Sequence, residues 1–248
     1  MPSTVPNDIG RVAMIVPTYN EVENIRPLAE QLLALSDTIE VLCVDDASPD
    51  GTGQLADEIS AAEPRFHVIH RTVNRGYAPS SKEGLAWCLE RGFDLICTMD
   101  GDLSHDPRAL PGMLERSAAG AALVIGSRYT DGGGLEVDWG PVRRAVSEMG
   151  SAYARFMIGT PVRDCTSGYR CYRAEALRKI DLGGLYSDGY SFLIEILAAI
   201  AKTGSTIEEF PITYVDRLRG ESKISRGIIF EALLETTRLG IRRVTGAR

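Results

Sequence analysis

Long apolar runs are missing from this sequence. No stretch approaches the roughly 18 uninterrupted apolar residues that a membrane-spanning helix requires. The first residues, MPSTVPNDIGR, also lack the basic-then-apolar pattern of a signal peptide. We therefore expect a cytoplasmic protein that does not cross a membrane by itself.

Paired cysteines and an excess of basic charge are missing as well. The five cysteines are odd in number and none are spaced as CxxC, so neither a disulfide framework nor a zinc site is predicted. The formal net charge of -7 argues against general binding of nucleic acid, for which a basic surface is expected. The sequence therefore predicts no nucleic-acid partner.

What the chain does contain is enough apolar material for one sizeable core. Its 248 residues are 44% hydrophobic and 25% charged, and no linker or repeat divides them, so we expect one domain over residues 1–248. Short apolar runs of strand length alternate with segments of helical spacing, which predicts an α/β fold with a mostly parallel central sheet and helices on both faces. The predicted strands are 12–17, 41–45, 66–70, 95–99 and 123–126.

The pattern changes after Gly126, which divides the chain into a donor-binding part of about 12–128 and an acceptor part of about 129–248. The second part contains a glycine-rich loop at 131–134 and a polar turn at 164–168. It also contains predicted helices at 142–157 and 190–202, a strand at 209–215, a polar loop at 217–223 and an amphipathic segment at 228–244.

The most informative local feature is Asp100-Gly101-Asp102, which follows a predicted buried strand. Residues two apart on an extended chain point the same way, so the two carboxylates can share one hard cation. Mg²⁺ or Mn²⁺ prefers such oxygen ligands and neutralises a departing diphosphate. A DxD alone also fits a solvated loop, but its place at a strand end favours a metal site, because ligands of parallel sheets bind at the carboxyl ends of strands.

Two more polar loops follow predicted strands. In the acidic turn at 44–52 we choose Asp46 as the acceptor for ribose hydroxyls or a base edge. For 48–52 a plain turn with Asp50 or Thr52 capping the next helix is an equal alternative. In PTYNE (17–21) Tyr19 supplies an aromatic face and Glu21 a carboxylate, while Asn20 can serve as a helix cap.

Cations able to meet a diphosphate occur at separate places in the chain. Each alone is also compatible with a plain surface cation, whereas a guanidinium can bind two phosphate oxygens at once. The candidates are Arg128, Arg143, Arg144, Arg217 and Lys223.

Taken together, six ordered motifs resemble those of the polyprenol monophosphomannose synthases, also called dolichol-phosphate mannose synthases, within the inverting family two of GT-A glycosyltransferases. The resemblance extends from about Val12 to the C-terminal helix, and its last two motifs are the more specific ones. The motifs are PTYNE (17–21), VDDASPDGT (44–52), MDGDLSH (99–105), GSRY (126–129), DCTSGYRCYR (164–173) and VDRLRGESK (215–223).

The resemblance implies a GT-A fold with a Rossmann-like sheet and a role for individual residues. It implies metal ligation by Asp100 and Asp102 and places Arg143 and Ser147 near the acceptor phosphate. It implies that Arg128 contacts phosphate and takes part in catalysis together with Asp102, Arg143 and Ser147. Donor contacts are implied for Pro17, Tyr19, Glu21, Val44, Asp46, Asp100, Gly101, Asp102, Arg128, Arg217 and Lys223.

The implied reaction transfers a hexose, mannose from GDP-mannose, to a polyprenyl monophosphate at the cytoplasmic face of a membrane, with Mg²⁺ or Mn²⁺. A phosphate monoester has a second pKa near about 6, so the acceptor is largely a dianion and needs little help from a base. We expect one in-line displacement with inversion. The segment at 228–244 fits either peripheral membrane docking or core packing, and a separate membrane-anchoring partner protein is compatible with the sequence.

One departure from the family pattern leaves alternatives open. The usual GLG-like glycine pair is replaced by Asn74-Arg75-Gly76-Tyr77-Ala78-Pro79, which we expect to stiffen a loop beside the donor. A soluble or peptide-linked acceptor and a UDP-glucose-type donor are therefore kept as alternatives. A nonenzymatic nucleotide-sugar sensor is a third, although a sensor has no need of both DxD carboxylates.

Overall fold

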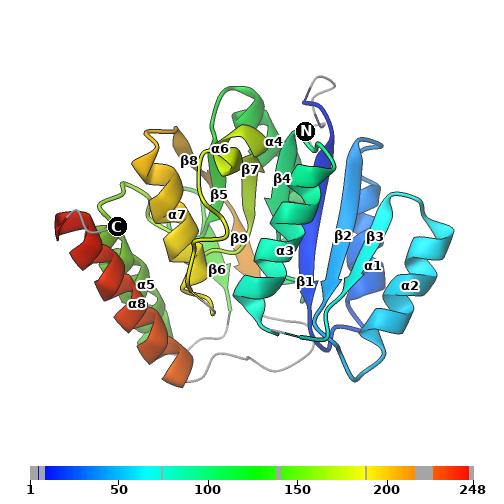
Figure 1. Ribbon diagram of the computed structural model, residues 1–248, viewed down its shortest axis with the longest axis horizontal. Coiled ribbons are helices and arrows are strands. Elements are labelled where there is room, and N and C mark those ends of the chain that lie inside the picture. The colour runs from blue at the N-terminus through cyan, green and yellow to red at the C-terminus, as the bar shows by residue number, and fades with distance from the viewer. Residues whose placement is uncertain are drawn as a thin grey trace.

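The computed structural model describes residue 5 and residues 9–73, 75–137, 141–187, 189–215 and 226–245, without the side chains of residues 141–143 and 226–229. A seven-stranded sheet of order β3-β2-β1-β4-β7-β5-β8 forms its centre (Figure 1). The strands of this sheet are β1 (Val12–Thr18), β2 (Ile39–Asp45), β3 (Phe66–His70), β4 (Leu95–Thr98), β5 (Leu123–Ser127), β7 (Arg170–Arg173) and β8 (Ile207–Pro211).

Parallel pairing at the centre of the sheet brings the motif loops together. β1 pairs in parallel with both β2 and β4, with Thr18 opposite Asp45 and Ile15 opposite Thr98. These strands consist almost wholly of buried residues because both faces of the sheet are covered. The loops after β1, β2 and β4 therefore leave the same edge of the sheet, and the five strands predicted from the sequence are confirmed.

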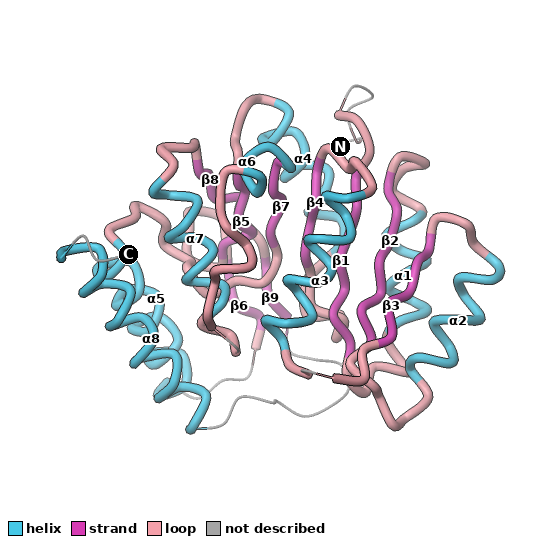
Figure 2. Tube along the Cα trace, viewed as in Figure 1, coloured by secondary structure: helices cyan, strands magenta, loops and turns pink. Residues whose placement is uncertain are grey.

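β7 was not predicted, and it runs antiparallel between β4 and β5 (Figure 2). Arg170 and Arg173 interrupt the apolar pattern by which a buried strand is recognised. Arg170 is nonetheless fully buried, because its guanidinium donates to the carbonyl oxygens of Ser167 (2.8 Å), Leu193 (2.7 Å) and Cys165 (2.9 Å). These bonds replace the water that the charged group loses.

Helices cover both faces of the sheet. On one face pack α1 (Ile25–Leu33), α2 (Thr52–Ala62) and α4 (Leu110–Ala118), which follows the short η1 (Pro107–Ala109). On the other pack α3 (Tyr77–Glu90), α6 (Ala174–Arg178) and α7 (Phe192–Lys202). Successive residues of β1 enter the two cores in turn, Met14 in the first and Ile15 in the second. The predicted α/β fold, with a mostly parallel sheet and helices on both faces, is confirmed.

The single strand predicted at 209–215 is wrong in detail, because two strands occupy this region. β8 ends at Pro211, and β9 (Thr213–Val215) pairs instead with β6 (Gly134–Glu136) in a separate two-stranded sheet. Between them the buried Ile212 donates its N–H to the Ser127 carbonyl (3.0 Å), and its own carbonyl accepts from Gly134 (3.0 Å). A change of partner strand leaves no mark on the apolar pattern, so periodicity could not reveal it.

Two long helices, α5 (Pro141–Ile158) and α8 (Arg226–Thr245), lie side by side at one end of the molecule (Figure 1). The Tyr153 hydroxyl of α5 lies 2.7 Å from the Thr237 hydroxyl of α8. Met157, one turn further along α5, packs directly against Gly240 of α8. The two helices therefore run parallel. None of the helices that the structure describes is long and apolar enough to cross a membrane.

Candidate active site

Each of the three loops at the central strand ends contains one non-glycine residue with a positive φ. These residues are Asn20 (φ 60°), Ala47 (φ 55°) and Leu103 (φ 61°). A left-handed conformation costs an ordinary residue roughly 1–2 kcal/mol, and such strain is typical of functional loops. Each of the three loops thus contains one strained backbone position just where the sequence places polar chemistry.

The loops enclose a pocket of about 220 Å³ at this edge of the sheet. Most of the predicted donor residues line it, together with others from α3 and from the segment before α7. The lining residues are Pro17, Thr18, Tyr19, Glu21, Asp46, Gly76, Tyr77, Ser80, Asp100, Gly101, Asp102 and Tyr190. Val44 is not among them, because its side chain is fully buried in the core under α3.

The two DxD carboxylates lie in this pocket in different surroundings. Asp102 is buried, and its Oδ1 accepts from the Ser104 amide (3.1 Å) and hydroxyl (2.6 Å). Asp100 is half-buried. Gly101 lies between them in a crowded place, because a β-carbon on this residue would lie 3.3 Å from Val16 Cγ1. A large side chain would not fit there. The result is a tight turn that presents two carboxylates to one pocket.

The oxygen-only character of this pair suits Mg²⁺ or Mn²⁺. Over the described ranges, no cluster of three or more His, Cys, Asp or Glu side chains could hold a metal ion. Mg²⁺ is commonly bound by one or two carboxylates, with water and substrate phosphates completing its shell. Asp100 and Asp102 fit that kind of site.

His105 connects the DxD loop to β9. Its buried ring lies between Tyr169 (centroids 5.3 Å apart) and Tyr214 (5.6 Å). Burial lowers the pKa of His105, although Asp100 and Asp102 act in the opposite direction. The backbone continues the connection through the Val215 amide, which donates to the Ser104 carbonyl (3.1 Å).

Asp46 has partners in the protein itself. Its Oδ1 accepts from Arg71 Nη1 (2.7 Å) and its Oδ2 from the Gly76 amide (2.6 Å). The buried Arg71 also donates to Ser80 Oγ (2.9 Å) and to Glu83 Oε2 (2.7 Å). Asp46 therefore ties the end of β2 to the start of α3, and the proposed ribose contact would share a carboxylate already engaged in this network.

The rest of the acidic turn is held within the protein, as the alternative expected, but its capping part is wrong, because the residue before α2 is Gly51 and no side chain caps that helix. Asp45 accepts from Ser48 Oγ (2.5 Å), and Asp50 accepts from the amide (3.0 Å) and hydroxyl (2.6 Å) of Thr52. These bonds hold the pKa of Asp50 below its ordinary value although burial raises it. Asn20 does not cap α1, because the residue before that helix is Asn24.

A second polar cluster surrounds Arg128, outside the pocket. Arg128 and Asp164 form a buried two-point ion pair, Nε to Oδ2 at 2.7 Å and Nη2 to Oδ1 at 2.8 Å. Burial alone would lower the pKa of Arg128 and raise that of Asp164, but the mutual attraction outweighs it and shifts both in the opposite directions. Arg128 Nη2 also donates to Thr166 Oγ1 (2.8 Å).

α5 joins this cluster through hydroxyl groups. The Ser147 hydroxyl lies 2.7 Å from that of Tyr129, whose ring packs against the Arg128 guanidinium. Ser151, one turn further, lies 3.3 Å from Thr166 Oγ1. Arg128 and Ser147, predicted as neighbours of the acceptor phosphate, are therefore linked through Tyr129.

Three predicted site residues receive no structural account. Arg143 lies in the first turn of α5, where side chains are outside the described part, and Arg217 and Lys223 lie outside the described residues. The exposed Arg144 donates weakly to the Leu135 carbonyl (3.5 Å).

Comparison with known families shows what kind of protein this is. A model described as Glycosyl transferase family 2 matches residues 13–181. The chain belongs to this family. It is therefore an enzyme that transfers glycosyl groups, which confirms the resemblance stated from the motifs and excludes the sensor alternative.

Two named proteins are similar to this glycosyltransferase over nearly its whole length. An undecaprenyl-phosphate mannosyltransferase of Micrococcus luteus is 46% identical over 93% of this chain and 94% of its own. A polyprenol monophosphomannose synthase of Mycolicibacterium smegmatis is 41% identical over 97% of this chain and 91% of its own. Among solved structures, glucosyl-3-phosphoglycerate synthase of Mycobacterium tuberculosis, with Mn2+, UDP-glucose and phosphoglyceric acid, has a TM-score of 0.68 and 19% identity, covering 93% of this chain and 80% of its own. That likeness shows the fold alone.

Sequence analysis missed several pocket residues of this glycosyltransferase. Tyr77 was assigned to a stiffened loop, and Ser80 was not assigned a role. In the structure Tyr77, Ala78 and Pro79 form the first turn of α3, where proline is tolerated. The expected stiff loop is thus a helix start. Tyr190 was read only as the beginning of a helix. The aromatic residue at 77 in place of the usual GLG-like pattern was the available signal.

Proposed function

We propose that this glycosyltransferase moves a mannosyl group from GDP-mannose to the phosphate of a polyprenyl monophosphate, with Mg²⁺ or Mn²⁺ at the donor. The observation that carries the proposal is the pocket in which the carboxylates of Asp100 and Asp102 meet the loops after β1 and β2. The acceptor class is supported by the two named relatives. We further propose that residues 1–248 act as one domain, because β7 and β8 belong to the same sheet as β1 to β4.

The donor would lie across the strand ends. Tyr19 offers an aromatic ring in the pocket, and the Arg75 guanidinium lies 4.9 Å from its centroid, so an apolar face and a cation stand together where the base would bind. Glu21 and Asp46 supply acceptors for ribose or base. Asp100 and Asp102 would hold the divalent ion, which when bound neutralises the departing diphosphate.

The acceptor phosphate would meet the cluster around Arg128. Its guanidinium is fixed in place by Asp164, and Tyr129 and Ser147 add hydroxyl groups beside it. Held donors of this kind orient an anion without needing to reorganise. Because a phosphate monoester is largely dianionic at neutral pH, these residues have only to orient it, not to remove a proton.

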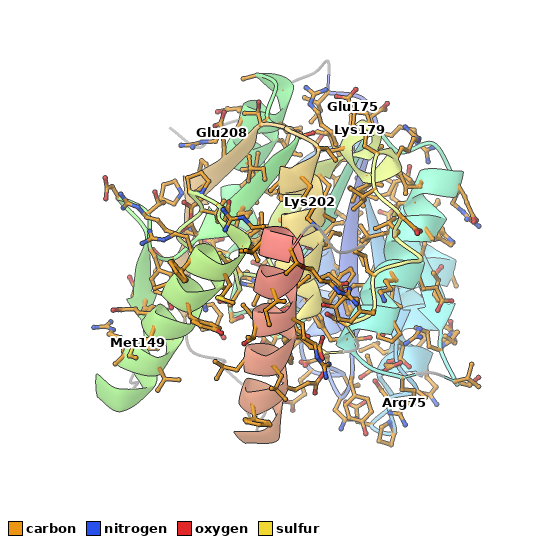
Figure 3. The ribbon with its side chains drawn as sticks, turned by 60° about the vertical axis from the view of Figure 1, so that its left-hand side comes forward. Arg75, Met149, Glu175, Lys179, Lys202 and Glu208 are labelled. Carbon is orange, nitrogen blue, oxygen red and sulfur yellow. The ribbon has the colours of Figure 1, made fainter. Side chains whose placement is uncertain are left out.

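The lipid part of the acceptor calls for an apolar surface near the site, and α5 and α8 supply one. Both helices carry exposed apolar side chains, which are Val146 (47%), Met149 (70%), Phe156 (79%), Phe230 (64%), Leu233 (45%), Leu234 (44%), Ile241 (56%) and Val244 (84%). Figure 3 shows Met149 on α5 toward the same end of the molecule as Arg75 at the pocket rim, whereas Glu175, Lys179 and Glu208 lie toward the opposite end. We propose that this surface docks peripherally on the cytoplasmic face of a membrane.

The test is a matrix of donors and acceptors with and without Mn²⁺. GDP-mannose, GDP-glucose and UDP-glucose are each combined with undecaprenyl phosphate, a soluble phosphate monoester and a peptide. We expect metal-dependent transfer of mannose into the lipid phase. Sugar transfer only to a soluble or peptide acceptor, or only from UDP-glucose, would replace the proposal by the corresponding alternative.

The metal site is tested with Asp102→Asn, which keeps the shape of the side chain and removes its charge. Asp106→Asn is the matched control, because Asp106 lies in the same loop but pairs with Arg108 outside the pocket. We expect a loss on the order of 100-fold in kcat for Asp102→Asn and little change for Asp106→Asn. Near-normal metal-dependent turnover of Asp102→Asn would show that the metal lies elsewhere.

A further inference from the structure

Gly168 is buried next to Tyr77 and Asp100, two residues that line the donor pocket, and backbone conformation does not explain why a glycine stands there. It is absent from the glycines with a positive φ, so an ordinary residue could adopt its conformation. Its carbonyl is held by the Thr98 hydroxyl at 2.7 Å, which fixes it to the end of β4. The reason for glycine must therefore be the space in front of its α-carbon.

Two oxygen atoms border that space. A β-carbon on residue 168 would lie 3.0 Å from Asp100 Oδ1 and 3.1 Å from the Tyr77 hydroxyl oxygen. Even a methyl group would therefore crowd both oxygens. Glycine therefore lets a carboxylate, which accepts hydrogen bonds, and a phenol, which can donate or accept, pack close against one point of the backbone. Both side chains line the pocket, so the gap that matters is the pocket space in front of these two oxygens.

Tyr77 is held firmly at this gap. Its ring stacks on that of Tyr190, with centroids 4.7 Å apart and planes inclined by 21°. Tyr77 begins α3, and Tyr190 comes from the segment before α7, so two distant parts of the chain form one aromatic wall of the pocket.

We infer that Tyr77, Asp100 and Gly168 form a subsite for one hydroxyl group of the transferred hexose, and that Tyr77 is a specificity-determining residue for the sugar. The inference rests on the proposed donor site, because a diphosphate at Asp100 and Asp102 leaves its hexose beside this gap. Asp100 can serve both roles, since a carboxylate has two oxygens with about four acceptor positions.

The test compares the parent nucleotide hexose with its monodeoxy analogues. The kcat/KM for transfer is measured for the hexose with all hydroxyls and for analogues lacking one hydroxyl at a time, in the wild-type enzyme and in Tyr77→Phe. We expect one analogue to be used about tenfold less well than the parent by the wild type, the loss of one neutral hydrogen bond. For Tyr77→Phe we expect kcat/KM with the parent to fall by about the same factor. With that one analogue, kcat/KM should be the same in Tyr77→Phe as in the wild type.

Two more variants guard against a merely structural effect. Tyr186→Phe is the matched control, because Tyr186 is outside the pocket and its ring contacts Arg242 of α8; its pattern of analogue use should equal that of the wild type. Gly168→Ala, whose methyl group would crowd both oxygens, should lower use of the parent more than use of the critical deoxy analogue, because only the parent's hydroxyl needs both oxygens in place. Thermal unfolding of each variant establishes that it is folded.

The outcomes separate this inference from the proposed function. If Tyr77→Phe lowers kcat/KM by the same factor for every analogue, or by none, the subsite is refuted even when mannose transfer to polyprenyl phosphate is established. If the donor matrix instead selects another nucleotide hexose, the proposed donor is wrong. The analogue series is then made on that hexose. The subsite is still supported if the wild type uses one analogue less well than the parent and Tyr77→Phe uses the two equally well.

Discussion

The buried ion pair between Arg128 and Asp164 gives a stability prediction that the structure makes quantitative. Asp164 has no exposed side-chain surface and Arg128 has 10%. Besides the guanidinium, Asp164 accepts from the Arg128 amide (3.0 Å) and the Ser167 amide (3.1 Å). Asp164→Ala would leave the buried guanidinium without its counterion, and breaking a buried pair in this way costs about 3–5 kcal/mol. For a chain of this size that corresponds to a fall in Tm of about 6–20 °C.

The matched control is Asp131→Ala. It removes the carboxylate of another Arg–Asp pair, with Arg163 at 3.0 Å, in which Asp131 is 98% exposed. Surface pairs contribute little, so we expect no measurable change in Tm. Both variants are followed by circular dichroism during heating, at one protein concentration and pH 7. A fall in Tm for Asp164→Ala no larger than for Asp131→Ala would refute the reasoning.

The pH dependence of this difference has a definite sign. The pKa of Asp164 in the folded protein lies below its ordinary value of 3.8, because Arg128 outweighs the effect of burial. A depressed carboxyl pKa contributes stability that is fully present above the unfolded-state pKa and is lost as the pH falls through the folded-state pKa. The gap in stability between wild type and Asp164→Ala should therefore be constant from pH 7 to about pH 5 and narrow below about pH 4.

Two further predictions concern the surface and the core. Phe230→Glu should weaken flotation of the enzyme with anionic vesicles, whereas Ala61→Glu, which adds the same charge on exposed α2, should not; equal effects would contradict docking through α8. Burial raises the pKa of Cys43, Cys88 and Cys165 to about 12, so iodoacetamide at pH 8 should label these thiols only after denaturation, as read by mass spectrometry, and rapid labelling of the native protein would contradict their burial.

The sequence allowed prediction of the parts of the site that follow from one general rule. Strands of parallel sheets end at a common edge, so the residues after β1, β2 and β4 could be expected to meet, and Tyr19, Asp46 and Asp100 do line one pocket. Local periodicity was sufficient for this, because each of these strands is an uninterrupted apolar run.

The remaining features depend on contacts that no local pattern encodes. Arg128 and Asp164 were each part of a recognised motif, but their pairing arises only when β5 lies next to the loop before β7. Asp46 was chosen as a donor contact without any sign that Arg71 would bind it. The stack of Tyr77 on Tyr190 likewise joins the start of α3 to the segment before α7, which periodicity treats separately. Such pairs are set by tertiary packing, which overrides the local signal.

The pairing of Arg128 with Asp164 also limits how the acceptor phosphate can be neutralised. A guanidinium with a carboxylate at 2.7 Å contributes almost no net charge to its surroundings, although it still orients a ligand by hydrogen bonds. The charge that offsets a dianionic phosphate must then come from the divalent ion proposed at Asp100 and Asp102 and from cations other than Arg128. The family resemblance places Arg143 near the acceptor phosphate, whereas Arg217 and Lys223 are expected at the donor. Orientation and charge compensation would therefore be divided between different groups, the first carried by a rigid buried pair and the second by the divalent ion and by other cations.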